Sequence, residues 1–207
     1  MSLRAKKKQR DREDILAAAE KLINAKGYDK ATMKDIALEA EVSYQTLYNY
    51  FPNKAFIVQV MMMQDIEVAN RKIGALIEAY RSDPLELIYS MAKTQLDMVS
   101  QRDRFLWREF VVEYIKQARE LVAAYNQTDA AAHERIQHAL TMTQERGHLD
   151  PSVNVEVLAS ALYNIGDMAF LSYIIQPKLT KQSMLQNFRA QLELIIAPYL
   201  TDRSRIT

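Results

Sequence analysis

The sequence of 207 residues contains no cysteine. Disulfides, thiolate catalysis and zinc sites built from cysteine are therefore excluded, and nothing in the chain requires an oxidising compartment. Only 4 glycines and 5 prolines interrupt it, while 49% of the residues are hydrophobic. Few chain breakers and a large apolar fraction favour a helical globule with one or two domains.

The sequence also lacks a run of about 18 apolar residues, which a helix needs to span a bilayer. Its charged N-terminal segment has no apolar stretch of the kind found in a signal peptide. We therefore expect a soluble, cytoplasmic protein with no membrane partner.

Patterns that would indicate catalysis or metal binding are sparse. His133 and His138 lie five positions apart, off the i, i+4 spacing that places two ligands on one helix face, and His148 follows a helix end. No Gly-rich phosphate loop and no Ser/His/Asp order stands out. We expect no enzymatic activity, no cofactor and no metal.

Residues 31–54 predict two short helices joined by a tight turn. Thr32 and Ser43 can each cap the N-terminus of a helix, and Pro52 ends the second one. Asn53 can cap a further helix that begins near Lys54. The apolar residues at helical spacing in this segment are Met33, Ile36, Ala37, Ala40, Leu47 and Phe51. Upstream, a helix that stops at Gly27 carries the stripe Ile15, Ala18, Ala19, Leu22 and Ile23.

The second short helix is polar and aromatic on one face, which suits the major groove of DNA. Tyr44 and Gln45, near its start, are placed to read base edges. Other polar groups suit phosphate oxygens, which fix the register without specifying the sequence. The predicted DNA-binding set is Thr32, Ser43, Tyr44, Gln45, Thr46, Tyr48, Asn49 and Lys54. An ordinary helical hairpin with a solvated polar face is the alternative.

A wider pattern over residues 11–60 consists of Gly27, Tyr28, Thr32, Ile36, Ala37, Val42, Ser43, Thr46, Leu47, Tyr48, Tyr50, Phe51 and Lys54. It resembles the N-terminal domain of the tetracycline-repressor (TetR) family of bacterial transcriptional regulators. Glu41 departs from the family, which usually has glycine there, so the turn either needs no positive φ or accepts it at a cost. Gln45 and Asn49 also depart, and Gln45 is a candidate source of sequence preference.

Charge is unevenly distributed. Residues 1–54 carry 11 Lys and Arg against 8 Asp and Glu, whereas residues 55–207 carry 16 against 18. The first residues concentrate the cations Arg4, Lys6, Lys7, Lys8, Arg10 and Arg12. We expect this basic segment to be a disordered arm, which either contacts DNA phosphates or a minor groove or acts as a solubilising tail.

The rest of the chain predicts further helices without internal repeats, so the fold class is all-α. The predicted ranges are 54–80, 84–100, two helices within 105–146 whose boundary lies between residues 115 and 122, then 150–175 and 180–200. We divide the chain into a helix-turn-helix domain with its basic arm, residues 1–54, and a larger helical domain, residues 55–207.

The last two helices are strongly apolar, which requires cover on more than one side. The family resemblance implies that two such helices from each of two subunits form a four-helix homodimer interface. The predicted interface residues are Leu158, Leu162, Phe188, Leu192, Ile195 and Tyr199. Burial within a single subunit is the alternative.

The resemblance also implies an effector site among the middle helices, although the family's pocket residues cannot be transferred by motif. Flexible and aromatic side chains with nearby amides suit an apolar pocket. The candidates are Met91, Gln95, Trp107, Phe110, Asn164 and Met168. Because this set is mainly apolar, we expect a hydrophobic small-molecule effector, with ordinary core packing as the alternative for each residue.

Together these features predict a homodimeric transcriptional regulator, a repressor that binds a pseudo-palindromic DNA operator and is released by an effector. An all-helical binding or interaction protein with vestigial DNA contacts is the alternative from a different class.

Overall fold

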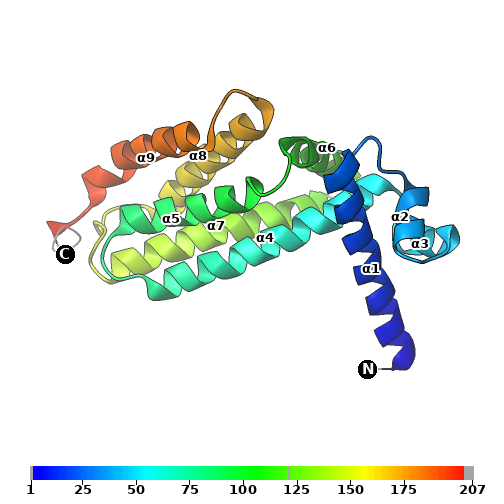
Figure 1. Cartoon of the computed structure of the whole chain (residues 1–207). Helices are drawn as coiled ribbons and strands as arrows, with labels where there is room; N and C mark the ends of the chain where they lie inside the picture. The colour runs from blue at the N-terminus through cyan, green and yellow to red at the C-terminus, as the bar shows by residue number, and fades with distance from the viewer. Residues whose placement is uncertain (1, 121, 203–207) are drawn as a thin grey trace. The chain divides into compact units, whose positions relative to one another are not determined.

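The computed structural model describes residues 2–120 and 122–202, with side chains described except at positions 114 and 117–129, and it is almost entirely helical (Figure 1). The helices are α1 (Leu3–Lys26), α2 (Met33–Glu39), α3 (Tyr44–Tyr50), α4 (Lys54–Ala79), α5 (Pro84–Val99), α6 (Arg104–Glu120), α7 (Val122–Glu145), α8 (Val155–Ile175) and α9 (Lys181–Ile196), followed by a 3-10 turn, η1 (Ala197–Tyr199). The predicted all-α class is confirmed. The predicted boundary within 105–146 falls at residue 121, outside the described residues.

The chain divides into two compact units, Met1–Gln64 and Asp65–Thr207. The sequence-based division lay earlier, after Lys54. The difference arises because the first turns of α4 belong to the core of the first unit, where Ile57, Val58 and Met62 are almost completely buried.

The first unit is built on a small core shared by α1, α2, α3 and the start of α4. Its buried side chains are Ile15, Leu16, Ala18, Ala19, Ile23, Ala31, Ile36, Ala37, Leu47, Phe51, Ile57, Val58, Met61 and Met62. The predicted caps are present, since Thr32 accepts a hydrogen bond from the N–H of Asp35 and Ser43 accepts one from Thr46. Two short helices thus meet at the expected turn.

The basic N-terminal segment is helical, which corrects the expected disordered arm. Ser2 caps α1 by accepting from the N–H of Ala5 at 3.2 Å. Side-chain pairs one turn apart support the helix further on, with Gln9 donating to Glu13 at 2.6 Å and Arg10 lying 3.8 Å from Asp14. The expectation of disorder rested on composition alone, which does not take account of this cap and these side-chain pairs.

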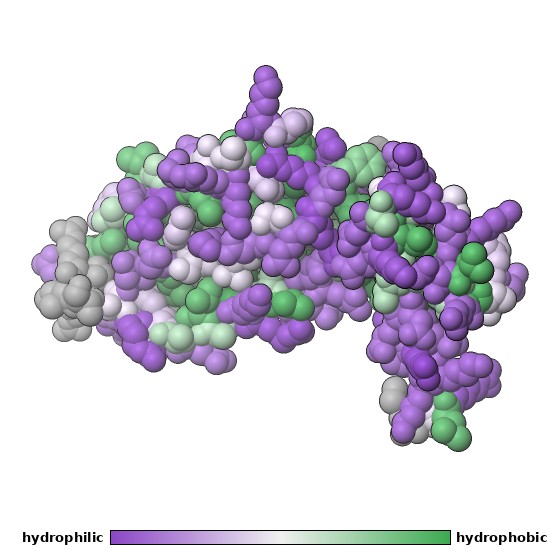
Figure 2. Space-filling view, in the orientation of Figure 1, coloured by the Kyte–Doolittle hydropathy of each residue, from purple (hydrophilic) through white to green (hydrophobic). Residues whose placement is uncertain are grey.

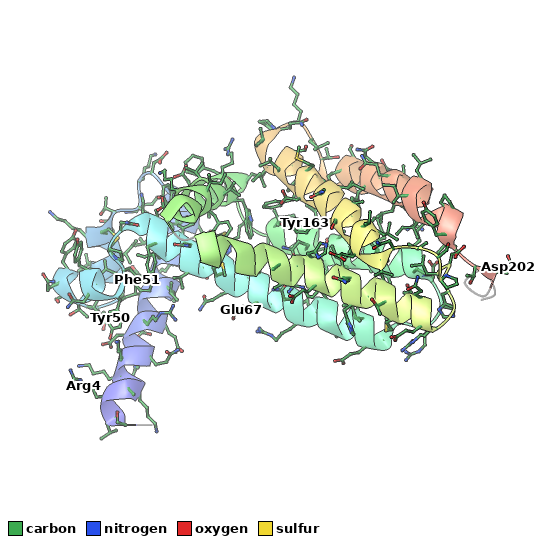
Figure 3. The ribbon with its side chains drawn as sticks, turned by 180° about the vertical axis from the view of Figure 1, so that it is seen from behind. Arg4, Tyr50, Phe51, Glu67, Tyr163 and Asp202 are labelled. Carbon is green, nitrogen blue, oxygen red and sulfur yellow. The ribbon has the colours of Figure 1, made fainter. Side chains whose placement is uncertain are left out.

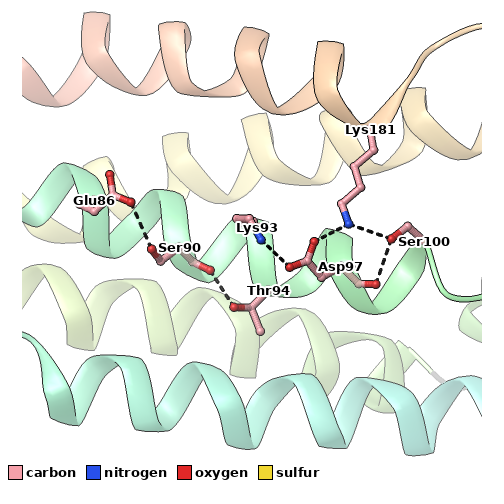
Figure 4. A network of polar contacts seen from close by, with 7 residues as sticks. All are labelled: Glu86, Ser90, Lys93, Thr94, Asp97, Ser100 and Lys181. Atoms are coloured by element: carbon pink, nitrogen blue, oxygen red, sulfur yellow. Dashed lines mark hydrogen bonds and ion pairs between the residues drawn. The ribbon is translucent and has the colours of Figure 1, made fainter.

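The second unit is a helical bundle in which α7 packs against α8, α6 and α5, and α9 packs against α5 and α8. Trp107 lies at its centre, 1% exposed, and donates from Nε1 to the carbonyl oxygen of Val99 at 2.9 Å. The end of α5 is joined to the start of α9 by an ion pair of Asp97 with Lys181 at 2.5 Å, and Lys93, one turn earlier in α5, lies 2.7 Å from the same carboxylate (Figure 4). Burial alone would raise the pKa of Asp97, but the bonds and charges of these two lysines lower it.

Helix α8 differs from the sequence-based expectation in two ways. It begins at Val155 rather than near residue 150, because Asn154 caps it and Asp150 instead accepts from the N–H of Ser152 in a tight turn. With 21 residues and a mean hydropathy of 1.3 in its most apolar stretch, it is also long and apolar enough to cross a membrane, contrary to the expected absence of such a run. A helix that packs in a bundle passes the same test, so this is weak evidence for a membrane.

The turn between α2 and α3 contains one residue in the left-handed region, Glu41, with φ of 54°. The turn therefore uses positive φ without glycine. At positive φ the Cβ atom lies too close to the backbone, which destabilises the folded state. Glu41→Gly should therefore raise the free energy of unfolding by about 0.5–1 kcal/mol. Gly27 provides the reverse test, because its φ is also positive, at 83°, and no atom lies within 4 Å of an added Cβ. We expect Gly27→Ala to lower stability by roughly 1–3 kcal/mol through backbone strain. Urea titration measures both, and equal signs would contradict this interpretation.

The cap of α2 carries an electrostatic prediction. The hydrogen bond from Lys26, helped by the hydroxyl and N–H of Thr32, lowers the pKa of Asp35 from 3.8 to about 2. Because the pKa is lower in the folded state, this contribution to stability is complete above pH 3.8 and is lost as the pH falls towards 2. The stability advantage of the wild type over Asp35→Asn should therefore shrink over that interval in denaturation curves. Lys26→Met should remove most of this pH dependence, whereas an unchanged dependence would exclude Lys26 as its main cause.

Candidate nucleic-acid interface

Helix α3 is held by a single fully buried side chain and presents most of its other side chains to solvent. Leu47 is completely buried, and Phe51, which follows the helix, is buried with it. The N-terminus is fixed by Ser43, which accepts from the N–H of Thr46 at 3.0 Å and lies 2.8 Å from its hydroxyl. A helix of seven residues is too short to be stable alone, so this anchor and cap determine which face is exposed.

Four of the predicted side chains form the exposed face of α3, which we call the reading face: Tyr44, Gln45, Tyr48 and Asn49. The two tyrosines are 49% and 51% exposed, far more than aromatic side chains in a core. Gln45 donates from Nε2 to Oδ1 of Asn49 at 3.1 Å. This bond links the two exposed amides and does not use the Gln45 oxygen or the Asn49 nitrogen. The face thus combines an acceptor, a donor and two phenol hydroxyls.

Two predicted DNA contacts have structural duties in this fold. Thr32 forms a capping box with Asp35, its hydroxyl accepting at 3.1 Å while its N–H donates to the carboxylate at 3.1 Å. The ammonium of Lys54 donates to the carbonyl oxygens of Tyr28 and Ala31, the latter at 2.8 Å, and lies 4.1 Å from the centre of the Tyr28 ring. Lys54 therefore holds the loop between α1 and α2.

Helix α1 is attached directly to the end of the reading helix, a contact that sequence reasoning missed. Tyr50 donates its hydroxyl to Asp11 at 3.3 Å, and the guanidinium of Arg12 lies 6.0 Å from the centre of the Phe51 ring. Figure 3 shows Tyr50 and Phe51 beside α1, with Arg4 near the far end of that helix. Burial, followed by the nearby Asp11 carboxylate, raises the pKa of Tyr50, which keeps the phenol protonated as a donor. Because the partners are 39 residues apart, no local pattern could have indicated this bond.

Four of the six predicted dimer residues are buried within their own subunit, whereas Tyr199 is exposed. Leu158, Leu162, Phe188 and Leu192 are all at most 6% exposed and pack inside their own unit, while Ile195 is half-buried. The stripe with most apolar residues is the one that the subunit uses for its own core. The exposed apolar side chains on α8, α9 and η1 are Val157, Met168, Ile175, Leu194 and Tyr199.

The predicted effector residues do not come together in one place. Met91, Trp107 and Phe110 are buried core residues, and Gln95 is half-buried. Asn164 and Met168 instead line an open groove of about 420 Å³ between α8 and α9, together with Met184, Asn187, Phe188 and Gln191. Flexible and aromatic composition predicted apolar surroundings correctly but could not separate core from surface.

Comparisons with known proteins agree with this arrangement. A family model described as bacterial regulatory proteins, tetR family, matches residues 15–61, which span the helices around the reading face. Over 188 residues the chain is 23% identical to the HTH-type transcriptional regulator UidR of Escherichia coli strain K12, covering 89% of this chain and 92% of that protein.

Two solved structures share the fold. One is Thermus thermophilus FadR, a TetR-family transcriptional repressor in complex with lauroyl-CoA, with a TM-score of 0.62, 18% identity and coverage of 87% of this chain and 92% of that one. The other is the complex of triclosan with SmeT, the repressor of a Stenotrophomonas maltophilia multidrug efflux pump, with a TM-score of 0.66, 17% identity and coverage of 95% and 94%.

The matched family model covers the buried anchor, the two capped helices and the exposed polar face described above, and the curated relative is matched over most of its length. Residues 15–61 thus match the tetR family of bacterial regulatory proteins, and over most of its length the chain is similar to a transcriptional regulator.

Proposed function

We propose that the protein is a repressor that binds a pseudo-palindromic operator as a homodimer and releases it when an apolar or amphipathic effector binds. The observation that carries this proposal is the reading face of α3, where four polar and aromatic side chains stand out from a helix fixed by Leu47. We assign DNA binding to the first compact unit and effector binding and dimerisation to the second.

The Gln45–Asn49 pair gives the reading face its base specificity. An amide side chain offers one acceptor and one donor, which match the N6 and N7 positions of adenine in the major groove. Because the Gln45 nitrogen donates to the Asn49 oxygen, the two amides are linked. The Gln45 oxygen and the Asn49 nitrogen are then available to bases as an acceptor and a donor at a fixed spacing. Ser43, Thr46 and Tyr48, which carry hydroxyls on α3 and its N-cap, contact phosphates in our proposal.

The exposed apolar side chains of α8 and α9 form the homodimer surface. Val157 is 64% exposed and Leu194 is 79% exposed, in a unit whose other large apolar side chains are mostly buried. Their cover by a second copy explains why α8 is apolar on more than one side. A two-fold dimer then places two equivalent reading helices about 34 Å or a multiple of that distance apart, which requires a pseudo-palindromic operator.

The effector acts on the second unit, whose interior around Met91, Trp107 and Phe110 is apolar and rich in methionine and aromatic rings. The structurally similar FadR and SmeT proteins were solved with lauroyl-CoA and triclosan, both of which contain large apolar groups. An effector releases DNA only to the extent that it prefers the conformation with the wrong spacing of reading helices. A protein of this kind acts in the cytoplasm, where its DNA is.

The recognition proposal is tested on the reading face. Gln45→Ala should change which sequences are bound, at a cost of roughly 1–3 kcal/mol against the preferred base. Tyr48→Phe, which keeps the ring and loses one phosphate contact, should weaken all sequences alike by about 1 kcal/mol. Selection from randomised duplexes, followed by titration of the selected DNA, separates the two effects. Equal and sequence-independent losses would exclude Gln45 as a base reader.

The dimer proposal is tested with two leucines of α9. Leu194→Glu should produce a folded monomer, because the side chain is exposed in the single subunit, and operator affinity should fall because each half-site alone offers half the contacts. Leu192→Glu places a charge in the core of the subunit and should unfold it, by several kcal/mol. Sedimentation and circular dichroism distinguish these results. A Leu194→Glu protein that remains a dimer would place the interface elsewhere.

A further inference from the structure

The first two turns of α1, which precede the contacts of Asp11 with Tyr50 and of Arg12 with Phe51, bury no side chain in the first unit. Residues 3–14 contain no buried side chain, the first being Ile15, and Leu3 at the tip is 88% exposed. Figure 2 shows this end of α1 as a mostly hydrophilic projection. A helical segment that buries no side chain gains little stability from packing, so the composition of residues 3–10 is free to serve another purpose.

The cations on this segment are arranged on two sides of the helix. Arg4, Lys7, Lys8 and Asp11 stand at i, i+3, i+4 and i+7 and therefore share one side. That side continues into the stripe that begins at Ile15 and forms the core of the unit. Lys6 and Arg10 project from the other side of the helix.

The side of Arg4, Lys7 and Lys8 is the side that faces the reading helix. Asp11 on this side accepts the hydrogen bond from Tyr50, the last residue of α3, and thereby fixes the base of the extension to that helix. Within the ranges 2–120 and 122–202, none of these three cations has an acidic partner, whereas Arg10 on the other side lies 3.8 Å from Asp14. The cations on the side that bears Asp11 are thus uncompensated.

We propose that Arg4, Lys7 and Lys8 form a phosphate-binding stripe, which contacts the DNA backbone beside the half-site read by α3. The proposal rests on the DNA-binding role of α3. With a rise of 1.5 Å per residue, the eight residues from Arg4 to Asp11 span about 12 Å, comparable to the width of the major groove. A stripe fixed at the end of α3 therefore reaches the phosphates that border the groove in which α3 lies. Its contacts add affinity without sequence information.

The two sides of the helix provide a matched experiment in the full-length chain. The stripe variant Lys7→Gln/Lys8→Gln and the control variant Lys6→Gln/Arg10→Gln lose the same charge from the same helical segment. Binding is measured between about 50 and 200 mM NaCl on a selected operator duplex and on a 30-base-pair duplex of arbitrary sequence. The stripe variant should flatten the slope of log affinity against log salt by about 1.8, because each lost phosphate contact removes about 0.9. The control variant should flatten it by less than half as much.

Equal flattening by both variants would overturn the proposal, because it would mean that the segment acts as a diffuse charge without a preferred side. No flattening by either variant would also overturn it and would leave the segment a solubilising extension. A wild-type chain that binds neither duplex would instead refute the DNA-binding role of α3 itself. Circular dichroism should show equal helix content in both variants, so a difference in slope reports the side of the helix and not its folding.

Discussion

The burial of Leu47 is the constraint on which the reading face depends. Helix α3 has seven residues and cannot persist without tertiary contacts, so the side that is buried decides which residues are available to DNA. Leu47 and Phe51 occupy that side, and Ser43 fixes the first turn. The arrangement of the amides and tyrosines on the opposite side follows from this anchor.

Side-chain bonds also hold the elements around α3 in the first unit. Lys54 binds the carbonyl oxygens of the loop before α2, and Lys26 binds Asp35 at the start of α2. Tyr50 joins the end of α3 to α1 through Asp11. Each of these bonds uses a charged or phenolic side chain to hold two helices or a loop together. Some polar residues near α3 therefore stabilise the fold.

The sequence predicted those features that depend on neighbouring residues. The caps at Thr32 and Ser43 and the end of α3 at Pro52 are local, so the helix-turn-helix could be placed almost to the residue. Features that depend on distant partners were missed, as with the bonds of Lys54 and Tyr50. Periodicity found the apolar stripes of α8 and α9 but assigned Leu192 to a partner subunit, because a stripe does not state whether its cover comes from the same chain. Trp107 was assigned to an effector pocket, with core packing as the alternative, because composition alone does not separate a pocket lining from a core.

Our central claim is that the reading face of α3 lies against base edges in the operator. The chain has no cysteine, so a single introduced cysteine is a unique attachment point for an iron chelate that cleaves nearby DNA. Leu38 of α2 is 80% exposed, and Leu38→Cys provides this point. With the selected operator, we predict two clusters of strand cleavage placed symmetrically about its centre and separated by about one helical turn or a multiple. A chelate on Glu78→Cys in the second unit should cleave much less. Full operator binding without symmetric cleavage from position 38 would contradict the account.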